Sequence, residues 1–69
     1  ALAIRKQIGD KAGEGTTLTN IGEVYRNLGE YPKALLHYQQ ALAIIKQIDD
    51  KSGEGTTLTN IGEVYRNLG

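Results

Sequence analysis

The chain has 69 residues, of which eight are basic and eight are acidic, so its formal net charge is zero. This length allows one small domain, close to the lower size limit for a self-sufficient hydrophobic core. The balanced charge gives no electrostatic bias toward nucleic acid or anionic lipid. The absence of cysteine excludes disulfides and thiolate metal sites. No apolar run is long enough to cross a membrane, and neither end resembles a signal peptide.

The sequence repeats itself after forty residues. Residues 1–29 recur as residues 41–69, and 26 of these 29 pairs are identical. The pairs that differ are Arg5/Ile45, Gly9/Asp49 and Ala12/Ser52. Because 69 residues are divided by a period of 40, the chain holds about one and three-quarter copies of the unit.

The first segment, residues 1–8, is predicted to be a short helical piece that corresponds to the second half of a longer helix at 41–48. A corner should follow it. Gly9 suits the positive φ that is common just past a helix end, and Asp10 suits the N-cap of the next helix. The second copy has Asp49 and Asp50 at this corner.

Apolar residues at three- and four-residue steps predict three further helices, over residues 11–28, 31–48 and 51–68. Gly29 and Glu30 form the corner between the first two, and Pro32 lies in the first turn of the second, where its missing N–H is tolerated. Corners of two residues make consecutive helices antiparallel. The apolar stripe is most regular over residues 31–48, where it comprises Tyr31, Ala34, Leu35, Tyr38, Ala41, Leu42, Ile45 and Ile48.

Glycines 13, 15 and 22 fall inside the predicted helix 11–28. Each weakens a helix interior by about 1 kcal/mol relative to alanine. A neighbouring helix packed against the bare backbone would compensate for this loss, and the apolar surroundings of Gly22 favour that explanation there. For Gly13 and Gly15 a frayed helix start is the alternative.

The spacing Leu18-x-x-Ile21-Gly22-x-x-Tyr25, followed by Gly29, Tyr31, Ala34, Tyr38 and Ala41, resembles the signature of the tetratricopeptide repeat family. The period of forty exceeds the usual thirty-four and resembles the extended variant of kinesin light chains. The resemblance implies an all-α, antiparallel helix–turn–helix solenoid that binds a protein or peptide, with residues 11–28 and 51–68 lining its concave face. No cofactor, nucleic acid or membrane is expected.

The predicted binding face is the side of these two helices away from the apolar stripe. Asn20 and Asn60 carry most weight, because an amide can both donate to and accept from a peptide backbone; bonding to a neighbouring helix or water is the alternative. Threonine and glutamate at the other positions do not support the carboxylate clamp of chaperone-binding members. The candidate peptide-binding residues are Thr16, Thr19, Asn20, Glu23, Arg26, Asn27, Thr56, Thr59, Asn60, Glu63, Arg66 and Asn67.

No catalytic or metal site is predicted. The only histidine, His37, lies on the polar side of helix 31–48 and is expected to face solvent, without a second imidazole or cysteine to complete a metal site. Glu23–Arg26 and Glu63–Arg66 are spaced for surface ion pairs within one helix. The alternative for these charges is a mixed-charge row that selects a partner.

The last helix, 51–68, should lack the neighbour that covers its apolar stripe, because one helical hairpin cannot bury its stripe alone. A homo-oligomer is therefore expected through uncovered terminal helices, by stacking or by helix exchange. The alternative function is a self-assembling structural repeat, natural or engineered, without a separate ligand. The candidate self-association residues are Leu58, Ile61, Tyr65 and Leu68.

Overall fold

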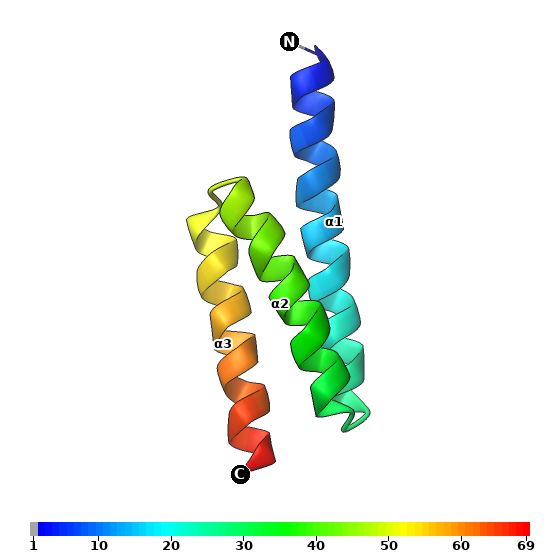
Figure 1. The fold of residues 1–69 in the computed structure, drawn as a ribbon, viewed down its shortest axis with the longest axis vertical. Coiled ribbons are helices and arrows are strands. Elements are labelled where there is room, and N and C mark those ends of the chain that lie inside the picture. Colours follow the sequence, from blue (N-terminus) through cyan, green and yellow to red (C-terminus); the bar gives the residue numbers. More distant parts are fainter. Residues whose placement is uncertain (1) are drawn as a thin grey trace.

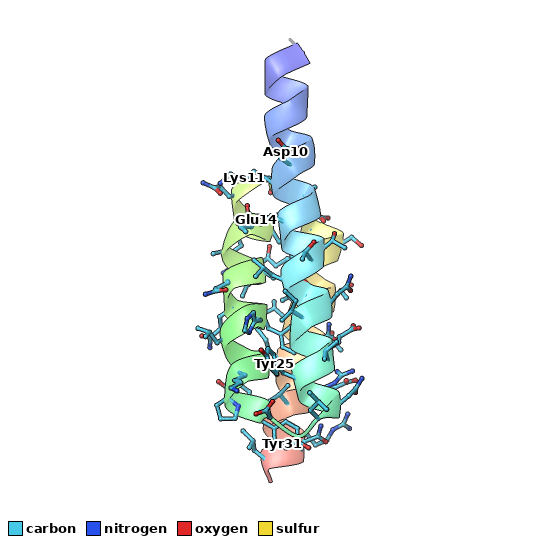
Figure 2. All side chains as sticks on the ribbon, turned by 90° about the vertical axis from the view of Figure 1, so that its right-hand side faces the viewer. Asp10, Lys11, Glu14, Tyr25 and Tyr31 are labelled. Carbon is cyan, nitrogen blue, oxygen red and sulfur yellow. The ribbon has the colours of Figure 1, made fainter. Side chains whose placement is uncertain are left out.

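The computed structural model describes the backbone of residues 2–69 and the side chains of residues 10–69. It contains helices α1 (Leu2–Asn27), α2 (Tyr31–Gln47) and α3 (Lys51–Leu68), and residues 2–69 contain no strand. In Figure 1, α2 runs antiparallel between α1 and α3. Figure 2 shows that α1 and α3 lie on the same side of α2, one behind the other. The predicted all-α helix–turn–helix fold is confirmed.

The two turns are built in the same way. Gly29 and Asp49 both have positive φ, of 78° and 57°. At the first turn the N–H of Glu30 donates to the carbonyl of Tyr25, and at the second the N–H of Asp50 donates to that of Ile45. These are the bonds of a Schellman motif, which satisfies carbonyls at a helix end and reverses the chain. An aspartate such as Asp49 can adopt a positive φ, at a steric cost that glycine avoids.

The predicted corner at Gly9 and Asp10 is wrong, because α1 continues through both residues as one helix from Leu2 to Asn27. Residues 9 and 10 occupy the same place in the repeat as the corner residues 49 and 50, but this correspondence alone does not produce a turn. A corner gives up helical hydrogen bonds and is stable only when the helices on either side pack together. The segment before Gly9 has Arg5 where its copy has Ile45, which is buried. Ala1 and the side chains of Leu2, Ile4 and Ile8 lie outside the described residues.

The core lies where α2 meets both neighbours. Tyr38, Ala34 and Val64 are fully buried and in contact with one another. Partly buried side chains close this cluster from all three helices: Tyr25, Tyr31, Leu35 and Ile61. Figure 2 shows Tyr25 and Tyr31 in the half of the molecule that contains the α1–α2 turn. The stripe of α2 thus contacts α1 and α3 together, whereas α1 and α3 contact each other little.

The long first helix shapes the molecule. The molecule extends 47 Å along its longest axis and 19 and 12 Å along the other two. In Figure 1 the N-terminal part of α1 projects beyond the other two helices, and the α2–α3 turn lies beside its middle. This turn and the facing part of α1 enclose the groove described next.

Candidate functional site

A groove with a volume of about 300 Å³ lies between α1 and α3 at the end of the molecule that contains the α2–α3 turn. Four of the predicted peptide-binding residues line it. Helices α1 and α3 supply a polar rim, and beneath it lie Ile45 of α2 and Ile48 at the C-cap of that helix. The lining residues are Ala12, Thr16, Thr19, Asn20, Ile45, Ile48, Asp50, Ser52, Gly53, Thr56 and Thr57.

Ile45 packs beside two glycines, one on each of the helices that form the walls. A β-carbon on Gly15 of α1 would lie 3.5 Å from Cγ1 of Ile45, and one on Gly53 of α3 would lie 3.4 Å from its Cγ2. Gly15 is buried inside the continuous helix α1, so the fraying considered for this glycine does not occur. Close packing against the bare backbone instead brings both walls onto one apolar residue.

Asp50 fixes the start of α3 at the edge of the groove. Its carboxylate accepts a hydrogen bond of 3.0 Å from the N–H of Gly53, which caps the helix. A carboxylate at a helix N-terminus is also stabilised by the helix dipole. This part of the rim therefore carries a negative charge that is held in place by backbone contacts.

The threonines of the predicted face differ in how free their hydroxyls are. The hydroxyl of Thr19 donates to the carbonyl of Gly15 over 2.9 Å, and that of Thr59 donates to the carbonyl of Gly55 over the same distance. Such bonds within a helix occupy the hydroxyl proton. Thr16 of α1 and its copy Thr56 of α3 both line the groove from exposed positions.

The two asparagines of greatest predicted weight have different surroundings. Asn20 is exposed and lines the groove. Asn60 is half-buried, does not line the groove, and its Nδ2 is buried without a hydrogen-bond partner among the described residues. The copies therefore do not form a uniform row, because α3 turns a different side toward α2 than α1 does.

An ion pair joins α1 to α3 farther along the seam. Nη1 of Arg26 lies 2.7 Å from Oε2 of Glu63, and the side chains are 21% and 41% exposed. The expected pairs within one helix, Glu23–Arg26 and Glu63–Arg66, are absent among residues 10–69. Because α1 and α3 stack in parallel, the arginine of one copy lies beside the glutamate of the next. This ion pair between helices forms in place of the expected pairs within each helix.

Beneath this ion pair lies Tyr38, whose ring reaches from α2 toward both neighbours. Burial raises the pKa of the Tyr38 phenol above its usual value of 10.0; the positive charge of Arg26 lowers it, and Glu23 and Glu63 raise it. The phenol oxygen is buried and has no hydrogen-bond partner among residues 10–69. The neutral form of the phenol is therefore the one that the folded chain favours.

Breaking the Arg26–Glu63 pair should have a small effect on stability and a measurable dependence on salt. We expect Arg26→Ala to lower the free energy of unfolding by about 1 kcal/mol or less, because the pair is partly exposed. A double-mutant cycle with Glu63→Ala, followed by urea unfolding at low and high salt, measures the coupling. Arg66→Ala, at the copied and exposed position, is the control. Equal effects of Arg26→Ala and Arg66→Ala would contradict an interaction between the helices.

The remaining predicted peptide-binding residues do not line the groove. Glu23 is half-buried, whereas Asn27, Thr59, Arg66 and Asn67 are exposed. The groove instead includes residues that the sequence analysis left out: Ala12, Asp50, Ser52, Gly53 and Thr57 among them. The N-cap signal at Asp50 and the end of the apolar stripe at Ile45 and Ile48 are the features of the sequence that point to this region.

The expected solvent-facing position of His37 is wrong. His37 is half-buried, and its ring packs against Tyr25 with centroids 5.1 Å apart. Its Nδ1 donates to the carbonyl of Lys33 over 2.7 Å, and Nζ of Lys33 lies 5.5 Å from the centroid of the Tyr25 ring. His37 therefore belongs to the α1–α2 contact. No cluster of His, Cys, Asp and Glu side chains suited to a metal ion occurs in the described part of the chain.

The predicted self-association stripe is divided between two surfaces. Leu58, Tyr65 and Leu68 are exposed, as expected. Ile61 is only partly exposed and packs against the core formed by Ala34, Tyr38 and Val64. Its inclusion in an uncovered surface was wrong, because α3 contacts α2 along the line of Thr57, Ile61 and Val64.

The structure is that of an α-helical repeat protein whose helix–turn–helix units stack side by side. The family model of the tetratricopeptide repeat matches residues 1–47 and, in a second match, residues 13–69. The chain belongs to this family, which mediates protein–protein interaction through a non-catalytic scaffold. Neither the curated proteins nor the solved structures gave a significant match. None of the helices in residues 2–69 is long and apolar enough to span a membrane.

Proposed function

We propose that the groove between α1 and α3 binds an extended segment of a partner protein. The observation that carries this proposal is the combination of an open groove, an apolar floor of Ile45 and Ile48, and the exposed amide of Asn20 on its rim. Binding sites commonly combine an apolar surface with a few polar groups that fix orientation. An amide satisfies a peptide N–H and a peptide carbonyl in turn, which suits a backbone without a defined side-chain sequence.

The charges around the groove favour a segment with a positively charged residue near the α2–α3 turn. Asp50 lies on the rim there, with one oxygen engaged by the N–H of Gly53 and the side chain exposed. The neighbouring rim positions Thr16, Ser52 and Thr56 are uncharged. A lysine or arginine of the segment would therefore meet a carboxylate without a competing cation among the lining residues.

The proposal is tested with peptides selected from a random displayed library against the full chain. Calorimetric titration then compares the wild type with Asn20→Ala and with Asn67→Ala, an exposed asparagine outside the groove. We expect Asn20→Ala to weaken binding by about tenfold, the value of one well-formed hydrogen bond, and Asn67→Ala to have no effect. Asp50→Asn should weaken peptides that contain lysine or arginine. Selected peptides that bind both asparagine variants equally would contradict the groove as the site.

A second candidate function is assembly of the chain with copies of itself. The exposure of Leu58, Tyr65 and Leu68 on one side of α3 favours it, because apolar patches on a small protein commonly mark contact surfaces. Sedimentation over a wide range of concentration tests this candidate. Tyr65→Glu should lower the average mass if copies associate through α3, whereas a mass that stays that of the monomer at every concentration would contradict assembly.

A further inference from the structure

One polar side chain at the floor of the groove has a hydroxyl without a partner. Thr57 lines the groove and is 1% exposed. The hydroxyls of Thr19 and Thr59 donate to carbonyls of their own helices, whereas that of Thr57 forms no hydrogen bond within residues 10–69. The fully buried side-chain atoms without a partner in this range are Tyr38 Oη and Asn60 Nδ2, and the Thr57 oxygen is not among them. This oxygen is therefore reached from the groove.

The carboxylate of Asp50 lies about one helical turn before this hydroxyl. Its Oδ1 accepts from the N–H of Gly53, and its Oδ2 lies in the space that a β-carbon on Gly53 would occupy. Gly53 and Thr57 are four residues apart in α3, and β-carbons at this spacing are about 5–6 Å from each other. One cationic nitrogen can span such a gap with two hydrogen bonds of about 2.8 Å.

The charge of Asp50 is not neutralised within the described part of the chain. Asp50 is the only charged residue among the described residues that line the groove. Lys51, its neighbour in sequence, is directed to the other carboxylate of the turn, since its Nζ lies 3.4 Å from Oδ1 of Asp49. None of the ion pairs of residues 10–69 includes Asp50. A cationic donor therefore satisfies both this carboxylate and the buried hydroxyl of Thr57.

An apolar surface lies beside these two oxygen groups. Cγ2 of Ile45 is 3.4 Å from the β-carbon position on Gly53, and Ile48 lines the groove as well. A flexible hydrocarbon stem can pack against the isoleucines while its charged end reaches the oxygens. This combination fits an alkylammonium group.

We propose that this end of the groove is a pocket for a lysine side chain of the bound segment, an inference that rests on the proposed binding of such a segment. The four-carbon stem lies along Ile45 and Ile48, and the ammonium donates to Oδ2 of Asp50 and to Oγ1 of Thr57. Lysine is favoured over arginine because the N–H of Gly53 already engages Oδ1 of Asp50, which a guanidinium needs for bidentate pairing. An ammonium instead directs its N–H groups to separate acceptors.

The test uses three pools of capped peptides that are random in sequence except for one fixed central residue, which is lysine, arginine or norleucine. The random positions omit lysine, arginine and histidine, so the fixed residue supplies the only side-chain cation. Each pool is passed at low concentration over the immobilised full chain, and the retained fraction is measured. We expect the lysine pool to be retained about tenfold more than the norleucine pool and about fivefold more than the arginine pool.

Two variants of the pocket have matched controls. Asp50→Asn keeps a residue that caps helices well and should remove the preference for lysine, whereas Asp49→Asn changes the same charge outside the groove and should leave it. Thr57→Val keeps the shape of the side chain and should lower retention of the lysine pool by about fivefold, without a change for the norleucine pool. Thr59→Val, at an exposed position outside the groove, should have no effect. Circular dichroism should show all four variants as helical as the wild type.

The outcomes separate the pocket from the groove as a whole. Equal retention of the lysine and norleucine pools, preference for arginine, or equal effects of Asp50→Asn and Asp49→Asn would overturn the lysine pocket. If retention of the pools in that case still falls on Asn20→Ala, the groove binds segments and only the pocket is wrong. Retention of none of the pools would overturn the pocket and the proposed function together.

Discussion

Gly22→Ala is expected to destabilise the chain by about 1–3 kcal/mol, although alanine is the better helix former. The new β-carbon would lie 2.7 Å from Cδ1 and from Cε1 of Tyr38. Tyr38 is fully buried in the core and cannot turn away without moving α2. Urea unfolding followed by circular dichroism measures the loss, which is a large part of the stability of so small a domain.

The copied position supplies the control for this prediction. Gly62→Ala should raise the free energy of unfolding by up to about 1 kcal/mol, because a β-carbon there meets no atom within 4 Å and helix propensity alone decides the outcome. The two glycines have the same local sequence, because residues 11–28 and 51–68 differ only at Ala12/Ser52. Equal effects at the two sites would contradict the finding that Gly22 is packed against Tyr38 while Gly62 is open.

Tyr38→Ala is expected to cost about 3–5 kcal/mol, which would leave most of the chain unfolded. The ring packs against the backbone of Gly22 and contacts Ala34 and Val64, so its removal leaves a cavity that all three helices line. Thermal unfolding by circular dichroism measures the effect. Tyr38→Phe keeps the ring and should be neutral or stabilising, since it removes a buried hydroxyl without a partner among residues 10–69. A folded Tyr38→Ala chain would contradict the central position of this ring.

The same pair of variants tests the alkaline behaviour of the fold. Burial raises the pKa of Tyr38 in the folded chain above 10.0, so the unfolded chain loses this proton first. The resulting stability is fully present below about pH 10 and is lost as pH rises through the folded pKa. Tyr38→Phe should remove this part of the alkaline loss. Identical stability profiles for Tyr38→Phe and wild type above pH 10 would contradict it.

The sequence predicts the architecture well where apolar spacing is regular over many turns. The stripe of α2 and the two-residue turns at its ends suffice to predict the antiparallel arrangement. The positions that match the family signature include several residues of this stripe. The corner at Gly9 and Asp10 could not be predicted, because a turn depends on the packing of the helices that flank it. Gly9 and Asp10 resemble the residues of a turn, yet α1 passes through them without interruption.

The candidate site is predicted in part for a similar reason. Four of the residues that the resemblance points to line the groove: Thr16, Thr19, Asn20 and Thr56. It cannot tell that Asn20 and Asn60 have different surroundings, because their local sequences are the same. Only the order of helices in the array decides which side of a repeated helix is covered. The Arg26–Glu63 pair likewise depends on how the two copies stack, and residue spacing within one helix gives no information about this contact.

The ion pair between α1 and α3 gives a stack of these units a polarity. Each helix of this sequence carries one glutamate and one arginine, and the contact uses the arginine of the earlier helix and the glutamate of the later one. Within residues 10–69, Glu23 on α1 and Arg66 on α3 form no ion pair. A further helix of this sequence, stacked in the same direction on either side, would therefore bring an arginine to Glu23 or a glutamate to Arg66, whereas a reversed one would not offer the same pairing.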